Sequence, residues 1–324
     1  MKKLFWIISV MFLLQACTTV QSVYFERLQP ADVNFPAQIR SVGVVNNMPP
    51  VHQDYKDVDY TSASLEGDGD IAAENWAQEL AAVDYFDQVV LYDKRVRKSA
   101  YPLEQPIPKE TVDELIRLLD VDMLLSMERV NVVLKDSTMF IPELYTFVPA
   151  AEGVVTSVVR AYLKQQEKPL FSIQKTDTLC WEIVQDLTFG DIVKDFSEYA
   201  ASIPMQYLLP YWKEEERRYF DGGNVNMRDA GVCVREQNWE EAYRLWKELY
   251  DTKKGKVKMR AAYNLAVYYE LQNDFVRAKE CLAAAQALAS EDSWEMQLIL
   301  LYQLQLEEQT RRNQRLNVQM KRFE

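Results

Sequence analysis

The chain has a single histidine, His52, which lies in a polar segment beside Pro49 and Pro50. Zinc sites usually combine several His or Cys ligands, and a Ser-His-Asp triad needs a histidine oriented by an acid. Neither arrangement is suggested around His52. Gly67 and Gly69 do not have the spacing of a phosphate-binding or dinucleotide-binding loop. We therefore predict a protein that is not an enzyme and has no metal site or cofactor.

Hard oxygen ligands gather between residues 54 and 70, which invites comparison with a calcium loop. The acids there are Asp54, Asp57, Asp59, Glu66, Asp68 and Asp70. Their order differs from an EF-hand, because Ile71 stands where that loop needs glycine after its third acid. We interpret the segment as a solvated acidic loop that ends where Asp70 caps a helix. Hydrolysis by paired carboxylates stays open, since no pair stands out among 49 acidic residues.

A second set of residues could bind a carboxylate or an acidic peptide. If the C-terminal helices form tetratricopeptide-like pairs, the first helix of each pair lines a concave groove. Repeat positions then place six side chains there: Arg228, Arg235, Arg260, Tyr263, Asn264 and Val267. Arginines bind carboxylates with paired hydrogen bonds, so this is our candidate partner-binding groove. The alternative is that the C-terminal helix fills the groove.

The repeat signal comes from small and aromatic residues at fixed spacing. Residues 261–269 read AAYNLAVYY, and a turn at 273–275 is followed by Ala278, Leu282 and Ala285. This matches the tetratricopeptide pattern. A weaker unit lies 36 residues earlier, with Ala230, Ala242 and Trp246. Two repeats need closing elements at both ends, and we expect a helix at 211–220 and a long helix from 292 to about 322, with Trp294, Leu298, Leu301 and Leu304 forming one face.

The preceding region reads as alternating strands and helices. Strands are predicted at 40–45, 89–92 and 121–134, separated by helices at 71–82 and 111–119. This order favours parallel neighbours with right-handed crossovers. Strands at 154–164 and 170–183 add an antiparallel hairpin, and a helix follows at 191–205. We expect 135–153 to be a long loop that covers the sheet edge.

The N-terminus has the features of an export signal. Lys2 and Lys3 precede eleven mostly apolar residues, too few for a membrane span. Residues 14–17, LQAC, resemble the lipobox of bacterial lipoproteins, which implies cleavage before Cys17 and its lipidation. An ordinary secretory signal or an uncleaved anchor is the alternative. Thr18 and the lack of an acidic run in 18–22 favour a periplasm-facing, outer-membrane anchor over surface exposure.

The net charge and the other cysteines indicate which partners and which disulfides are to be expected. The net charge of −12 disfavours nucleic acid as a partner. Cys180, Cys233 and Cys281 are interpreted as small buried hydrophobic residues, with a Cys233–Cys281 bridge left open.

Several segments together resemble a family of Bacteroides-type lipoproteins of unknown function with a C-terminal tetratricopeptide region. They are the lipobox, residues 40–46 (RSVGVVN), 210–219 from PYW to RRY, 239–242 (WEEA) and 261–266 (AAYNLA). The resemblance implies an architecture and no activity.

We therefore predict an α+β protein with four segments: a signal peptide at 1–16, a lipid-anchored tether at 17–37, an α/β domain at 38–221 and a helical domain at 222–324. The expected function is a protein-interaction scaffold with an envelope protein partner, of unknown oligomeric state. The alternative is a glycan-binding protein or hydrolase that uses the α/β domain, with 135–153 as a lid.

Overall fold

The computed structural model describes residues 20–50, 63–99, 105–183 and 188–323. The chain divides into two compact units. Unit 1 contains residues up to Pro30 and Tyr211–Met320, and unit 2 contains Ala31–Pro210 and the end of the chain from Lys321. The fold class is α+β, with a mixed sheet region followed by a helical region, as the sequence predicts.

Unit 2 is built on a sheet whose strand order is β4-β2-β5-β6-β7, with β3 added beside β5. The central strand β2 (Ser41–Asn46) pairs in parallel with β4 (Gln88–Leu91) and β5 (Met123–Ile141). Strands β6 (Thr146–Leu163) and β7 (Phe171–Glu182) extend it as antiparallel neighbours, and β3 (Ser64–Glu66) is antiparallel to β5. The predicted parallel neighbours and the antiparallel hairpin are therefore confirmed.

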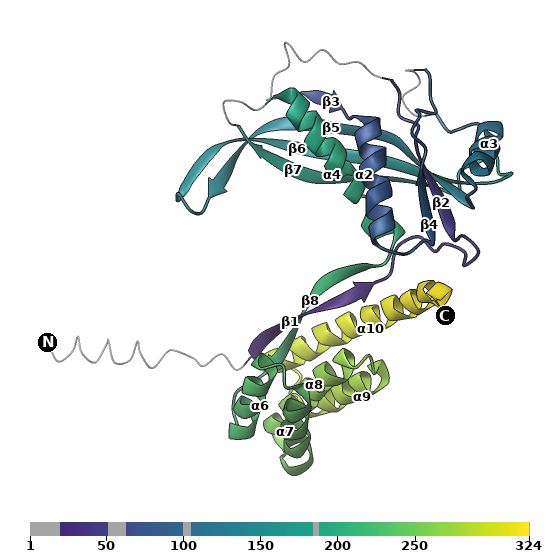
Figure 1. Ribbon diagram of the computed structural model, residues 1–324. Coiled ribbons are helices and arrows are strands. Elements are labelled where there is room, and N and C mark those ends of the chain that lie inside the picture. Colours follow the sequence, from purple (N-terminus) through teal and green to yellow (C-terminus); the bar gives the residue numbers. More distant parts are fainter. Residues whose placement is uncertain (1–19, 51–62, 100–104, 184–187, 324) are drawn as a thin grey trace. The chain divides into compact units, whose positions relative to one another are not determined.

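Helices cover both faces of this sheet. Helices α2 (Gly69–Ala82) and α4 (Phe189–Ser202) lie side by side on one face, where Trp76, Leu80 and Phe196 join the main core (Figure 1). Helix α3 (Lys109–Leu119) packs on the other face through Val112 and Ile116. The cap of α2 is Asp68 rather than Asp70, since the Asp68 carboxylate accepts the backbone N–H of Asp70 and Ile71.

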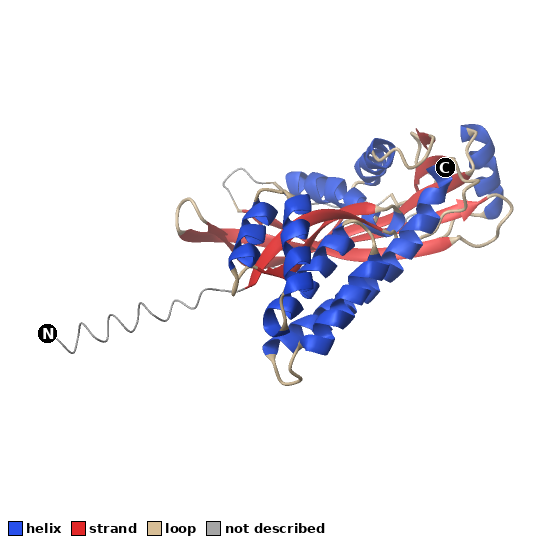
Figure 2. Cartoon of the chain, turned by 90° about the horizontal axis from the view of Figure 1, so that it is seen from below, coloured by secondary structure: helices blue, strands red, loops and turns tan. Residues whose placement is uncertain are grey.

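Unit 1 joins a two-stranded ribbon to five helices. Strand β1 (Val20–Gln29) pairs antiparallel with β8 (Tyr211–Phe220) over their full length. The helices are α6 (Val225–Arg235), α7 (Trp239–Thr252), α8 (Gly255–Leu271), α9 (Phe275–Leu288) and α10 (Trp294–Met320), drawn in Figure 2 with the strands in red. Successive helices pack as antiparallel pairs around Trp246, Tyr263 and Leu282.

The ribbon corrects two predictions. Residues 211–220, expected as a helix, form strand β8, and part of the expected tether 17–37 is strand β1. The sequence of β8 is rich in Lys, Glu and Arg, which are good helix formers. It becomes a strand because each of its residues has a partner in β1, from Val20 opposite Phe220 to Gln29 opposite Tyr211.

Residues 135–153 are not a loop. They continue β5 and β6 as paired strands, with Lys135 opposite Glu152 and Ile141 opposite Thr146. The turn between them is Pro142–Tyr145, and Tyr145 has φ of 49°. A lid formed by 135–153 is therefore excluded, because both strands are held in the sheet ladder.

Three further expectations differ from the structure. The division at Pro210 lies one strand before the predicted boundary at 221, and a short helix, α5 (Met205–Leu208), precedes it. Cys180 is exposed rather than buried. Cys233 and Cys281 are half-buried and carry free thiols, so the open question of their bridge is answered in this structure.

Within the ranges that the structure describes, no helix combines the length and apolar character needed to cross a bilayer.

Candidate interaction surface

The structure does not assemble the six predicted groove residues into an open groove. Arg228 and Arg235 are exposed on α6, and Arg235 lies 3.8 Å from the carboxylate of Asp221. The other four, Arg260, Tyr263, Asn264 and Val267, are buried in α8. The inner side of the helix pairs is occupied by the chain itself.

Asn264 shows how the end of β8 fills that side. Its side-chain oxygen accepts the N–H of Phe220 at 2.7 Å, and its amide nitrogen donates to the carbonyl of Phe220 at 2.6 Å. The ring of Tyr263 packs edge-on against Phe220 and, at an interplanar angle of 52°, against Tyr302 of α10. The amide and the ring that we assigned to a partner peptide instead recognise the protein's own backbone.

Arg260 likewise binds other residues of unit 1. Its guanidinium donates to the Gly222 carbonyl at 3.1 Å and to Glu295 of α10 at 3.3 Å, and it lies over the ring of Phe220. Lys256 also reaches Glu295, at 2.6 Å, and these cations lower the pKa of that carboxyl against its partial burial. Arg260 therefore ties α10 and β8 to α8.

A second buried network fastens the ribbon to the helices. Glu270 of α8 is fully buried and accepts two hydrogen bonds from Arg217 of β8, at 2.8 and 2.9 Å. Tyr302 of α10 donates to the same carboxylate at 2.7 Å, and Arg27 of β1 lies 3.5 Å away. Four elements far apart in sequence meet at one carboxylate, so this cluster has a structural role.

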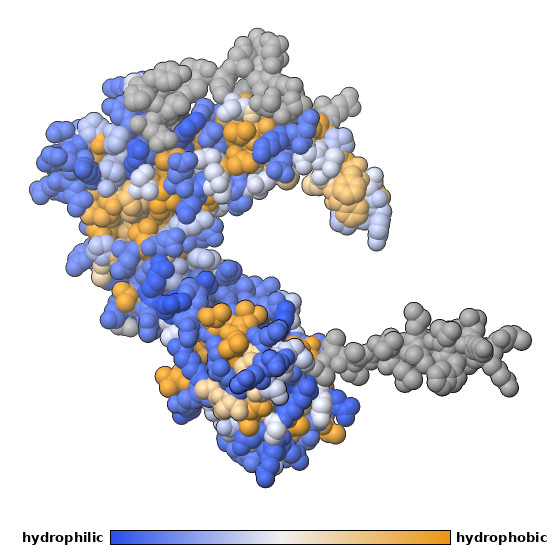
Figure 3. Space-filling view, turned by 180° about the vertical axis from the view of Figure 1, so that it is seen from behind, coloured by the Kyte–Doolittle hydropathy of each residue, from blue (hydrophilic) through white to orange (hydrophobic). Residues whose placement is uncertain are grey.

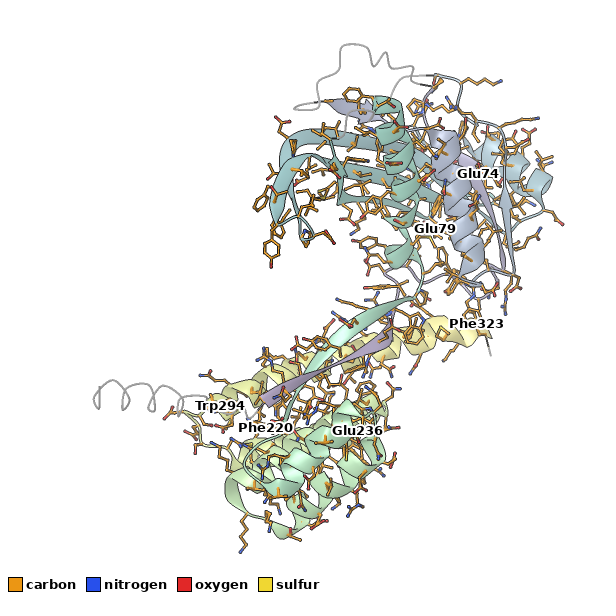
Figure 4. All side chains as sticks on the ribbon, turned by 60° about the vertical axis from the view of Figure 1, so that its left-hand side comes forward. Glu74, Glu79, Phe220, Glu236, Trp294 and Phe323 are labelled. Atoms are coloured by element: carbon orange, nitrogen blue, oxygen red, sulfur yellow. The ribbon has the colours of Figure 1, made fainter. Side chains whose placement is uncertain are left out.

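Helix α10 turns a different face inward from the one that its apolar residues predict. Leu298 is buried as expected, but the residues beside it on the inner face are Glu295, Ile299, Tyr302, Leu306 and Gln309. The outer face keeps four large apolar side chains in solvent: Trp294, Leu300, Leu301 and Leu304. We call these four the outer stripe of α10. Trp294 lies next to Phe220 with ring centroids 5.8 Å apart, as seen in Figure 4.

Unit 2 exposes a second apolar group at the end of the β5–β6 hairpin. Phe140, Leu144, Tyr145 and Phe147 are exposed there, and Phe140 contacts both other rings at 5.1 and 6.1 Å between centroids. We call residues 138–149 the hairpin tip. In Figure 3 apolar and polar side chains lie together at this far end of the hairpin. Contiguous exposed apolar groups commonly mark sites of contact with another molecule.

Unit 2 also contains a buried acid, Glu128, at a bulge in β5. Its carboxylate accepts hydrogen bonds from Asn47 at 2.8 Å, Tyr162 at 3.0 Å and Arg160 at 3.2 Å. Burial raises the pKa of Glu128, and these donors oppose that effect only in part. Burial and the neighbouring carboxylate likewise raise the pKa of Tyr162.

Asn47 connects Glu128 to a cavity of about 310 Å³ lined in part by Arg97, Gln105 and Thr111. Its amide donates to Glu128 and to the Gln105 carbonyl at 3.0 Å, while the Tyr162 hydroxyl accepts the N–H of Ile107 at 3.2 Å. Three donors occupy the Glu128 carboxylate, which favours a role in fixing segment 105–107 to the sheet. In the described parts of the chain no cluster of His, Cys, Asp and Glu side chains has the geometry of a metal site.

The outer stripe and the hairpin tip escaped prediction for the same reason. The sequence pattern places Leu301 and Leu304 on the core-facing side of the last helix and assigns 135–153 to a covering loop. Only the tertiary structure shows that neither is covered.

Comparisons with known proteins identify two family matches. Residues 39–220 match the family described as domain of unknown function DUF8603, and residues 228–308 match the domain of unknown function DUF6340. A search of curated protein sequences gives no match.

Among solved structures, the chain is similar to the PelC dodecamer from Paraburkholderia phytofirmans in space group P6, at 14% identity and a TM-score of 0.26. That alignment covers 57% of this chain and 99% of the other. A PelC variant from the same organism, in space group C2, aligns at 14% identity with a TM-score of 0.27, over 58% of this chain and 99% of that one.

Proposed function

This chain belongs to the DUF8603 family, and since that description assigns no activity, we propose from its residues that it is a non-enzymatic scaffold lipoprotein. In this proposal Cys17, which lies outside the described residues, carries the lipid. The anchor sits in the outer membrane with the protein facing the periplasm. The tetratricopeptide-like helices of unit 1 bind an envelope protein.

The observation that carries the proposal is the outer stripe of α10. Leu304 is 66% exposed, and Leu300 and Leu301 are exposed beside it on the same helical face. Because these leucines are about half exposed, a partner that buried them would gain about 1 kcal/mol for each, roughly half the value for a fully exposed leucine. Their spacing of three and four residues suits the apolar face of a partner helix or a groove in a partner protein.

The inner side of the helix pairs is a poorer partner site than the sequence suggests. Arg260, Tyr263 and Asn264 already have partners in β8 and α10. A partner peptide would have to displace those contacts, whereas the outer stripe is open. We therefore place the proposed partner site on α10 and not in the predicted groove.

The rival proposal, a glycan-binding protein or hydrolase in unit 2, has less support. Residues 135–153 form strands, so the lid that it required does not exist. Glu128 is an acid near a cavity, but its side chain has no exposed surface and its carboxylate already accepts hydrogen bonds from Asn47, Tyr162 and Arg160. A general base needs a free lone pair within reach of substrate.

The test is crosslinking in intact cells followed by mass spectrometry, with the lipid anchor left in place. We expect a recurring envelope protein to be recovered with the wild-type chain and lost with Leu301→Gln/Leu304→Gln. Val276→Gln is the matched control, because Val276 is 69% exposed on α9 in the same unit. Equal recovery from the stripe variant and the control would contradict the proposal.

Charge reversal of all three arginines does not separate loss of partner binding from misfolding. Arg260→Glu would place a carboxylate against Glu295, so loss of partner binding would also follow from misfolding. Arg228→Glu/Arg235→Gln changes two exposed side chains and, although it gives up the Arg235–Asp221 pair, places no carboxylate against Asp221. Unchanged binding in that double variant is the result expected if the partner uses α10.

A further inference from the structure

The hairpin tip is set apart from the rest of unit 2 by its composition. Between Thr138 and Pro149 the only acidic side chain is that of Glu143, and there is no Lys, Arg or His. Leu144 and Tyr145, the last two residues of the turn, are 69% and 89% exposed. Charged residues return directly behind the tip, at Lys135, Asp136 and Glu152.

The tip extends past the neighbouring strands. Strand β3 pairs with β5 as far as Val133, and β7 pairs with β6 as far as Ala150. Beyond those residues, β5 and β6 are paired with each other up to Ile141 and Thr146. Because Ala150 lies opposite Ser137, the stretch beyond both β3 and β7 runs from Ser137 to Ile141 and spans about 13 Å at 3.3 Å per residue. The apolar side chains are therefore held on a narrow ribbon, away from the core of the unit.

We infer that the hairpin tip inserts its turn into the interfacial region of a lipid bilayer. The inference rests on the proposed function in one point only, namely that a lipid at Cys17 keeps the chain at a membrane. The geometry of the tip supplies the other arguments.

The narrow shape of the tip suits a lipid surface. Four exposed apolar side chains lie close to one turn, and membrane binding strengthens with the apolar area that is buried, without a minimum contact size. Tyr and Phe are suited to the interface because their rings tolerate a boundary that is apolar on one side and wet on the other.

The pattern of exposure disfavours edge pairing with a second copy. Strand addition would cover the edges of β5 and β6, but the most exposed apolar residues lie in the turn at Leu144 and Tyr145. Contact with a surface met end-on covers the turn first. This orientation fits a lipid interface better than a neighbouring strand.

Backbone hydrogen bonding limits the depth of insertion. The outer edges of a two-stranded ribbon carry unpaired N–H and C=O groups, which are costly in hydrocarbon but are hydrated at the headgroup level. Pro142 and Pro149 remove two of these donors. Insertion is therefore shallow, with the charged row at Lys135, Asp136 and Glu152 remaining in water.

The inference is tested by vesicle flotation with a chain that begins at Thr18, which keeps every described element and lacks the lipid. Zwitterionic phosphatidylcholine vesicles are used, so that net charge has little influence. We expect the wild-type chain to float with the vesicles in 0.5 M NaCl, because salt screens charges and not apolar contacts. We expect Leu144→Gln/Phe147→Gln to lower the floated fraction at least tenfold. Leu144→Phe/Phe147→Leu should restore it.

Leu301→Gln/Leu304→Gln, the partner-site variant, serves as the control and should float like wild type. A wild-type chain that stays with the soluble fractions would overturn the inference, and so would a hairpin variant that floats equally well. A hairpin variant that changes the oligomeric state in gel filtration while flotation is absent would assign the tip to self-association instead. Because the flotation chain has no lipid, these outcomes are independent of the anchor and of the partner on α10.

Discussion

Arg217 of β8 donates two parallel hydrogen bonds to the carboxylate of Glu270 of α8, from Nε to Oε2 at 2.9 Å and from Nη2 to Oε1 at 2.8 Å. Both side chains are buried. The pair makes the ribbon part of the helical unit and, with the Phe220–Asn264 contact, explains why the inner side of the helix pairs is not open to a partner.

Removing the carboxylate should destabilise unit 1. In Glu270→Gln, Arg27 and Arg217 keep their burial and lose the Glu270 carboxylate, so that Arg217 is left with Glu215 alone, which should lower the free energy of unfolding by about 3–5 kcal/mol. Asp251→Asn, which breaks the exposed pair with Lys247, should cost under about 1 kcal/mol. Urea denaturation of both variants measures the contrast, and similar losses would argue against a structural role for the network.

Asn264→Ala should leave the N–H and C=O of Phe220 buried without their side-chain partner. We expect a loss of about 2–4 kcal/mol in the free energy of unfolding, since each unsatisfied buried group costs about 1–3 kcal/mol. Asn226→Ala on α6, where the side chain makes a long 3.4 Å contact with Glu248, should cost about 0.5 kcal/mol or less. If Asn264→Ala were as mild as this control, the end of β8 would not be held as described.

Glu128 should make part of the stability of unit 2 depend on pH. Burial raises the pKa of its carboxyl above the ordinary value of 4.5, so the folded chain binds this proton more tightly than the unfolded chain. Its unfavourable contribution is therefore absent below pH 4.5, grows as pH rises toward the folded pKa, and is complete above it. Relative to Glu128→Gln, the wild-type chain should gain stability when pH falls from 7 to 4.5. Parallel pH profiles for the two proteins, measured by urea denaturation, would contradict the raised pKa.

Cys17 carries the proposed anchor. Cells expressing the wild-type chain should incorporate labelled palmitate into the mature protein, while Cys17→Ser should not and should keep residues 1–16. Cys180→Ser, which changes an exposed thiol, should be labelled like wild type. Intact-mass measurement separates the processed from the unprocessed chain, and labelling of Cys17→Ser would rule the anchor out.

The core of unit 2 could be predicted from sequence because its signals are local. Strand β2 is a short apolar run, and α2 and α3 carry their buried residues at helical spacing. The same local rules failed at β8. Its inward residues Glu215 and Arg217 are charged, and their burial depends on Arg27, Glu270 and Tyr302, which lie far away in the sequence.

The two candidate surfaces could not be predicted from the sequence either, because long-range contacts decide which side chains are buried. The inward face of α10 contains two polar side chains, Glu295 and Tyr302. Glu295 can be buried because it pairs with Lys256 and Arg260, and Tyr302 because its hydroxyl donates to Glu270. A count of apolar residues along the helix therefore selects the wrong face. The hairpin tip is predicted as a loop, but its two prolines do not prevent strand pairing, because Pro142 lies in the turn and Pro149 still pairs with Thr138.

The central claim, that the outer stripe of α10 binds an envelope protein, is tested most directly by placing a photo-crosslinking amino acid at position 304 in living cells. The account predicts one discrete crosslinked protein from position 304 and none from position 276, whose side chain in wild type is equally exposed in the same unit. Absence of a crosslink at 304, or the same products at both positions, would contradict it.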